Sequence, residues 1–125
     1  MLCNRCTSNL QTIQVGKTGK LLCFKYNFGV TLIGNYPNDK ECDWTVSVPA
    51  GQKVKLVFQK FDTEASYDLV KVYDGGNDRS TLIKNLSGGS AQADITSTGN
   101  QLYVTFKSDS SQNAKGFKAV VSGLY

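Results

Sequence analysis

The sequence predicts an all-β protein: an antiparallel, jelly-roll-like β-sandwich with an extra N-terminal strand or arm. Apolar and polar residues alternate in four runs, at 52–61, 67–75, 100–109 and 115–125. Alternation with a period of two gives each strand one apolar face. Turn-forming segments rich in Gly, Pro, Asn, Asp and Ser separate these runs, and helical periodicity is nearly absent. Many short strands separated by such turns are typical of a β-sandwich.

The alternation also predicts which side chains form the core. In residues 52–61, Val54, Leu56 and Phe58 lie on one face of the strand, and lysines occupy positions on the other. The same argument applies to the remaining runs and to the segment around the only tryptophan. We expect these core residues: Trp44, Val46, Val54, Leu56, Phe58, Leu102, Val104, Phe106, Phe117 and Ala119.

Composition limits the classes of function. The 125 residues suffice for one domain with one core, and the net charge of +4 is too small to indicate nucleic acid as a partner. No segment approaches the roughly 18 apolar residues of a membrane span. The absence of histidine removes the Ser-His and Cys-His nucleophile pairs. Without histidine, an enzyme would need a carboxylate pair such as Asp62 and Glu64 acting on a sugar. We expect instead a protein without catalytic activity.

All four cysteines lie in the first third of the chain, at Cys3, Cys6, Cys23 and Cys42. Zinc bound by four thiolates usually needs two close pairs, and only Cys3 and Cys6 form one. We therefore favour two disulfides and an oxidising compartment, and three connectivities are open. Asn85 begins the triplet Asn-Leu-Ser, the acceptor pattern for N-glycosylation. We expect a secreted protein or the extracellular part of a larger one.

A series of short motifs runs from about Cys23 to Tyr125. The matching segments are, in order, NYPNDKECDWTVSVPAGQKVKLVFQKFDTE, YDLVKVYDG, ITSTGNQLYVTFKSD and GFKAVV. In this order they strongly resemble the motifs of the CUB domain family. The resemblance implies a non-catalytic β-sandwich module over residues 23–125, with residues 1–22 as an extension packed on or near it.

The resemblance also offers a reason for an unusual cluster of acidic residues. Asp62, Glu64 and Asp68 precede a strand, although acidic residues are poor strand formers. Many CUB domains bind calcium at one end of the sandwich, and the residues that match their ligands here are Glu64, Asp68 and Asp109. Carboxylates from separate loops are standard donors to Ca²⁺. The bound ion would orient these groups to receive a lysine or arginine of an extracellular protein partner. The alternative is that they cap turns and accept backbone hydrogen bonds.

The chain departs from the family pattern at two points. Ser66 and Ser87 stand where the family usually has a pair of disulfide-bonded cysteines, and the segment from Glu64 to Asp68 is several residues shorter than usual.

The resemblance bears on the cysteines too. Cys23 and Cys42 fit the family's first disulfide, which leaves Cys3 and Cys6 to pair with each other or to lie outside the core. The competing arrangement joins Cys3 to Cys23 and Cys6 to Cys42.

A second function rests on lysines at exposed positions of the predicted strands. They are Lys53, Lys55, Lys71, Lys107 and Lys118. If they converge, they form a face for a glycan or polyanion that needs no calcium, as the spermadhesin branch of the family suggests. Salt would weaken binding at such a face, whereas a chelator would abolish binding at the acidic residues.

Overall fold

The computed structural model describes residues 4–5, 11–14, 27–29, 41–90, 92–108 and 116–124, and its regular structure consists of strands. The strands are β1 (Asn4–Arg5), β2 (Gln11–Gln14), β3 (Asn27–Gly29), β4 (Glu41–Ser47), β5 (Lys53–Asp62), β6 (Leu69–Asp74), β7 (Thr81–Leu86), β8 (Ile95–Thr96), β9 (Gln101–Lys107) and β10 (Gly116–Leu124). The all-β prediction is confirmed. In the described part of the chain, no helix is long and apolar enough to cross a membrane.

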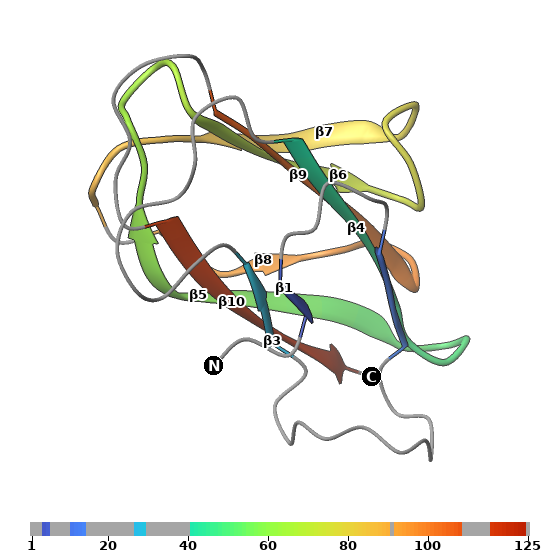
Figure 1. Ribbon diagram of the computed structural model, residues 1–125. Helices are drawn as coiled ribbons and strands as arrows, with labels where there is room; N and C mark the ends of the chain where they lie inside the picture. Colours follow the sequence, from blue (N-terminus) through green and yellow to red (C-terminus); the bar gives the residue numbers. More distant parts are fainter. Residues whose placement is uncertain are drawn as a thin grey trace.

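The strands form two five-stranded sheets that face each other (Figure 1). One sheet has the order β1-β3-β10-β5-β8, and the other has the order β2-β4-β9-β6-β7. The pairings β1–β3 and β2–β4 are parallel, and the other pairings of the described strands are antiparallel. The sequence predicted one extra N-terminal strand or arm; the structure places two short strands there, one in each sheet. A domain boundary after residue 22 stays a prediction.

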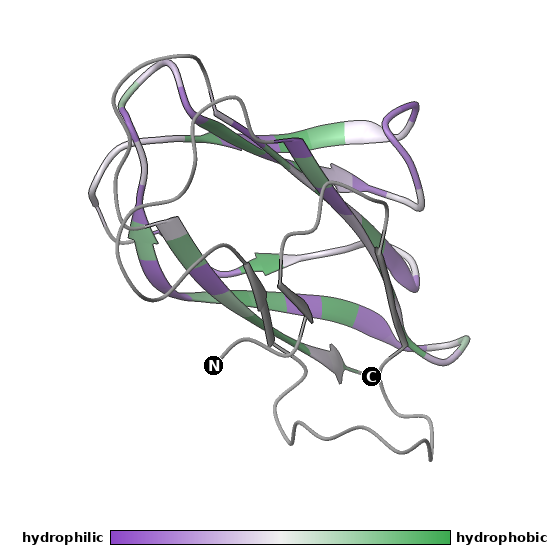
Figure 2. Ribbon diagram, viewed as in Figure 1, coloured by the Kyte–Doolittle hydropathy of each residue, from purple (hydrophilic) through white to green (hydrophobic). Residues whose placement is uncertain are grey.

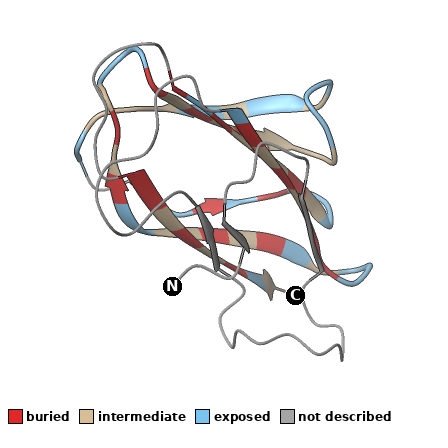
Figure 3. Cartoon of the chain, viewed as in Figure 1, coloured by how far each residue is buried: buried red, intermediate tan, exposed pale blue. Residues whose placement is uncertain are grey.

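Burial follows the alternation of the sequence. In β9, Leu102, Val104 and Phe106 are buried, whereas Tyr103 and Thr105 between them are half-buried on the outer face. Apolar and polar residues alternate along β5 in Figure 2, and buried residues alternate with more exposed ones in Figure 3. Every strand with this pattern therefore turns one face to the core and the other to solvent.

Aromatic rings from both sheets meet at the centre of the core. The ring of Phe117 in β10 lies 5.7 Å from that of Trp44 in β4 and 5.9 Å from that of Phe106 in β9, between ring centroids. Phe58 and Phe61 of β5 approach the same ring at 6.0 and 6.3 Å. All predicted core residues are buried except Phe58, which is partly buried and packs against the core.

One end of the sandwich is closed by hydrogen bonds between loops. Val48 N donates to the carbonyl of Asn100 at 3.0 Å, and the Asn100 side chain donates to the carbonyl of Val48 at 3.1 Å. The carboxylate of Asp74 accepts bonds from the backbone N (3.0 Å) and the hydroxyl (2.7 Å) of Thr98. Gly51 has φ +91° in the turn that Gln52 N closes on the carbonyl of Pro49, a conformation that glycine adopts without strain.

Because Phe117 contacts rings from both sheets, we expect Phe117→Ala to lower the free energy of unfolding by about 3–5 kcal/mol. Urea denaturation measures the change. Leu82→Ala is the control, because Leu82 is 46% exposed on β7, and we expect its effect to stay within about 0.5 kcal/mol. Equal losses in the two variants would contradict this description of the core.

Candidate functional site

The acidic residues lie at the other end of the sandwich, in the turn between β5 and β6. The carbonyl of Glu64 accepts hydrogen bonds from the backbone N of Tyr67 (3.3 Å) and of Asp68 (3.0 Å). These bonds close the turn and bring Glu64 and Asp68 to its two ends. We call this end of the molecule the acidic pole.

The two carboxyl groups at the acidic pole are shielded from solvent to different degrees. Asp68 is 0% exposed, and the Oε1 atom of Glu64 is buried. Burying a charged carboxylate costs free energy unless partners compensate it. A hard divalent cation offsets that cost, and Ca²⁺ prefers oxygen donors of this kind. By donor chemistry alone, Glu64 and Asp68 suit Ca²⁺.

The third predicted ligand, Asp109, lies outside the described residues. The strand register still places its neighbour Ser108 near the acidic pole. Leu69 of β6 pairs with Lys107 of β9 in an antiparallel ladder. Asp68, which precedes Leu69, and Ser108, which follows Lys107, therefore lie at the same end of this strand pair. Ser108 is 3% exposed. Among the described residues, no group of three His, Cys, Asp or Glu side chains lies close enough to hold a metal. The three-residue calcium set stays a prediction.

Ser66 and Ser87, the two positions that depart from the family pattern, are in contact. The backbone N of Ser66 donates to the hydroxyl of Ser87 at 2.9 Å. Next to it, Thr63 and Gly88 exchange two hydrogen bonds of 2.9 and 3.1 Å. Ser66 has φ +68°, a conformation that is uncommon outside glycine. These bonds fasten the acidic turn to the loop that follows β7.

The other predicted site residues are placed only in part. Cys42 is disulfide-bonded, but Cys3, Cys6 and Cys23 lie outside the described residues, so the pairing stays a prediction. Asn85 is exposed on β7, an edge strand, in register with Lys71 of β6.

The structure divides the predicted lysine face between two sheets. Lys53 and Lys55 of β5 and Lys118 of β10 belong to one sheet, and Lys71 of β6 and Lys107 of β9 belong to the other. Each alternates with buried neighbours and therefore points to the outer face of its own sheet. These five lysines do not form one continuous face. Lys60, which sequence analysis did not select, pairs directly with Lys118.

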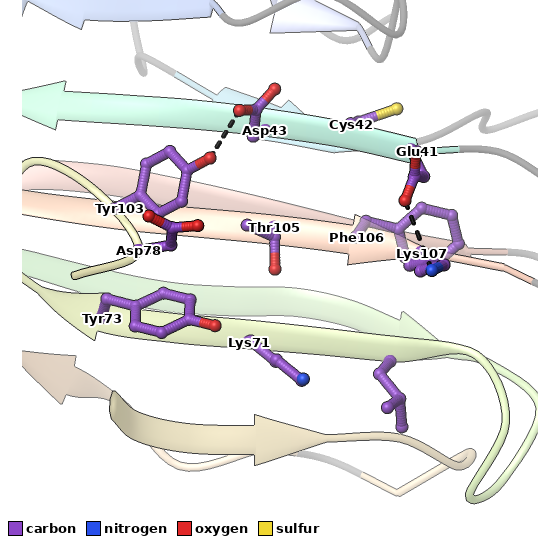
Figure 4. A pocket seen from close by; sticks show the side chains of 11 residues that line it. Glu41, Cys42, Asp43, Lys71, Tyr73, Asp78, Tyr103, Thr105, Phe106 and Lys107 are labelled. Atoms are coloured by element: carbon purple, nitrogen blue, oxygen red, sulfur yellow. Dashed lines mark hydrogen bonds and ion pairs between the residues drawn. The ribbon is translucent and has the colours of Figure 1, made fainter. Parts of the chain in front are cut away.

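A concave surface lies on the outer face of β4, β9 and β6. It is a hollow of about 370 Å³ whose lining includes Asp43, Lys71, Tyr73, Asp78, Tyr103 and Thr105 (Figure 4). The tyrosine rings of Tyr73 and Tyr103 are in contact, with centroids 5.8 Å apart. The hydroxyl of Tyr103 donates a hydrogen bond to the carboxylate of Asp43. The outward alternation of β6 and β9 was visible in the sequence, but the register that joins the strands was not.

The electrostatic environment of this hollow is acidic around Tyr103. Burial raises the pKa of Tyr103 far above its ordinary value of 10.0, and the hydrogen bond to Asp43 and the charges of Asp43 and Asp78 raise it further. The tyrosine hydroxyl therefore keeps its proton, and it remains a donor to Asp43, throughout the physiological pH range.

Comparison with known proteins agrees with this architecture. The CUB domain family model matches residues 27–120. A bone morphogenetic protein 1 homologue from Strongylocentrotus purpuratus is 46% identical over 93 residues, which are 68% of this chain and 15% of that protein. Human tolloid-like protein 1 is 37% identical over 91 residues, 70% of this chain and 9% of that protein. The crystal structure of the MASP-1 CUB2 domain bound to Ca²⁺ superimposes with a TM-score of 0.67 at 24% identity and covers 94% of this chain and 99% of that domain.

The fold and the matched relatives define a class of interaction modules found in extracellular proteins. The chain belongs to the CUB domain family, whose members are interaction modules without catalytic activity of their own. It spans between 9% and 15% of the length of the two curated relatives.

The contact between Ser66 and Ser87 leads to a prediction about stability. We expect the variant Ser66→Cys/Ser87→Cys to form a disulfide in air and to gain about 3 kcal/mol of unfolding free energy from closure of the loop between them. Thiol titration and thermal melts with and without reductant measure both effects. Ser66→Cys alone is the control. Persistent free thiols in the folded double variant would show that the two side chains do not approach.

The raised pKa of Tyr103 leads to a prediction about alkaline stability. The folded state holds this proton more tightly than the unfolded chain, so the contribution is fully present below about pH 10 and is lost as the pH rises above it. Tyr103→Phe should reduce the fall in urea midpoint between about pH 8 and about pH 11. Tyr67→Phe is the control, because Tyr67 is 66% exposed. If the urea midpoint of both variants falls as much between these pH values as that of the wild type, Tyr103 does not cause the fall.

Proposed function

We propose that this chain is an extracellular interaction module that binds Ca²⁺ at the acidic pole and uses that site to receive a lysine or arginine of a partner protein. The observation that carries the proposal is the closed turn with Glu64 at one end and the fully buried Asp68 at the other. In this proposal the chain is secreted or is part of the extracellular region of a larger protein.

Calcium would connect segments that are separate in the sequence. Glu64 and Asp68 supply donors from the turn before β6, and Asp109 supplies the third from the segment after β9. Six to eight oxygen ligands surround Ca²⁺ in proteins, so backbone carbonyls or water would complete the shell. The ion would hold the carboxylates in fixed positions, and their remaining negative charge would attract a partner's basic side chain.

The short segment between Glu64 and Asp68 supports the proposal. Its closure by two backbone bonds and its attachment through Ser66 to Ser87 hold the backbone of the turn in place before any ion binds. A site that is already ordered loses less conformational entropy on binding. Calcium binding also occurs within the family, since the MASP-1 CUB2 domain is described as bound to Ca²⁺.

Calcium should stabilise the folded protein. At a free concentration 100 times the dissociation constant, the gain in unfolding free energy is about 2.7 kcal/mol. Asp68→Asn should remove most of this gain, because it replaces a charged ligand by a neutral oxygen. Thermal melts in calcium and in chelator give the comparison. Asp78→Asn is the matched control and should keep the full gain, since Asp78 is exposed in the loop between β6 and β7.

The recognition step has its own test. A sensor surface densely coated with a lysine-containing peptide should retain the wild-type protein in calcium and release it in chelator, and Asp68→Asn should not bind. Many weak contacts on one surface raise the apparent affinity to a measurable level. A melt that saturating calcium leaves unchanged would show that Glu64 and Asp68 only stabilise the turn.

One observation favours a second candidate function, binding of a polyanionic glycan without calcium. Lys60 and Lys118 are directly paired across β5 and β10, and like charges in that position repel each other unless an anion lies between them. Heparin is a suitable probe: its binding should fall with salt, ignore chelator and weaken in Lys60→Gln/Lys118→Gln. Lys71→Gln is the control, because Lys71 lies on the other sheet. If Lys60→Gln/Lys118→Gln binds heparin as well as Lys71→Gln does, Lys60 and Lys118 do not form the binding face.

A further inference from the structure

The hollow on the outer face of β4, β9 and β6 has a short side chain, Thr105, in its lining. Thr105 is the central residue of one cross-strand row, with Asp43 on one side and Lys71 on the other. The next row places Tyr103 beside Tyr73. Because a threonine is much shorter than Lys71, Tyr73 and Tyr103, the sheet surface dips above it. Figure 4 shows these side chains on the three strands around the dip.

We propose that this hollow binds a neutral sugar ring of a glycan. A pyranose has an apolar face of C–H groups and a rim of hydroxyls that both donate and accept hydrogen bonds. Tyr73 and Tyr103 are half-buried and line the hollow, so part of each ring is available for the apolar face. At about 370 Å³, the hollow lies at the small end of the range for ligand sites, which suits one or two sugar rings.

The polar groups of the hollow include both donors and acceptors. Asp78 supplies carboxylate oxygens that accept from sugar hydroxyls, and the ammonium of Lys71 donates to them. In the described part of the chain, neither Asp78 nor Lys71 forms an ion pair. The hydroxyl of Thr105 adds a group that can do both. A neutral polyol therefore finds partners of each kind in one place.

These groups are held in position before a ligand arrives. The hydrogen bond from Tyr103 to Asp43 fixes one ring and one carboxylate. The loop that carries Asp78 is tied to the sheet by Thr45, whose hydroxyl donates to the carbonyl of Gly76 at 3.3 Å. Within that loop, the Asn77 side chain accepts a bond from the backbone N of Arg79 at 3.0 Å. Such preorganisation lowers the entropy cost of binding.

Charge balance favours a neutral ligand over a cation. Lys71 lies within the hollow, and Lys107 lies at its edge, where it forms an ion pair with Glu41 at 3.5 Å. A guanidinium or ammonium attracted to Asp43 and Asp78 would be repelled by Lys71. A sugar ring uses both signs of charge as hydrogen-bond partners and brings none of its own.

The experiment is protein NMR with methyl glycosides of glucose, galactose, mannose and N-acetylglucosamine, one at a time. We expect at least one to shift the amide signals of Tyr73, Tyr103 and Thr105, with a dissociation constant of about 1 mM, because an open hollow leaves part of the ring in water. The shifts should persist in chelator and in high salt. The Asn85→Gln background keeps any glycan attached beside Lys71 from entering the hollow.

Matched variants test which residues carry the binding. Asp78→Asn should weaken binding about tenfold or more, the size expected for hydrogen bonds to a charged group, and Tyr73→Ala should abolish it. Asp68→Asn and Tyr67→Ala are the controls, since they remove a carboxylate and a tyrosine outside the hollow, and both should bind as the wild type does. Asp68→Asn also separates this site from the calcium site, because it should lose the calcium response and keep the sugar.

Three outcomes would overturn the proposal. One is that none of the four glycosides produces shifts at the hollow at about 100 times the expected dissociation constant. Another is that shifts appear but Asp78→Asn and Tyr73→Ala leave them unchanged. The third is that methylguanidinium shifts these signals in a salt-sensitive manner and the glycosides do not, which would make the hollow a docking site for a basic side chain.

Discussion

The contact of Phe117 with rings from the opposite sheet is the constraint on which the rest of the structure depends. Its ring projects from its own sheet into the core, where it contacts the rings of Trp44 and Phe106 from the opposite sheet. Side chains along a strand point alternately to its two faces. Once these three residues point to the core, the directions of all the remaining side chains on β4, β9 and β10 are set. The outer faces therefore carry the polar and half-buried residues, and any recognition by a sheet face must use them.

The two ends of the sandwich have different chemistry. At one end, Val48, Asn100, Asp74 and Thr98 satisfy one another with hydrogen bonds, and Asp74 is used to hold a loop. At the acidic pole, backbone hydrogen bonds to the carbonyl of Glu64 close the turn. The carboxylate of Asp74 therefore has a structural role, whereas the role proposed for the carboxylates of Glu64 and Asp68 is to bind a cation. The protein is basic overall, so this local acidity comes from placement and not from composition.

Much of the fold could be predicted from the sequence, because alternation reports directly on which face of a strand is buried. The strands β6, β9 and β10 lie within three of the alternating runs, and β5 extends one residue beyond the fourth, to Asp62. The burial of Trp44 and Leu56 in the core followed from the same pattern. Strand β7 was not predicted. It lies at an edge and has no fully buried side chain, so its sequence carries no period-two signal. The parallel pairing of the N-terminal strands was likewise invisible, because a strand pattern says nothing about its neighbour.

For the proposed binding surfaces, the sequence alone determined that Glu64 and Asp68 lie near each other, since only three residues separate them. It also determined that the lysines point outward, but not that they divide between two sheets. The hollow was decided by tertiary structure alone: Asp43, Asp78 and Thr105 are far apart in the chain. Only the pairing of β4, β9 and β6, and the loop that Thr45 ties down, bring them together. Alternation fixes the face of a residue, whereas strand order and register, which arise from packing the whole core, fix its neighbours.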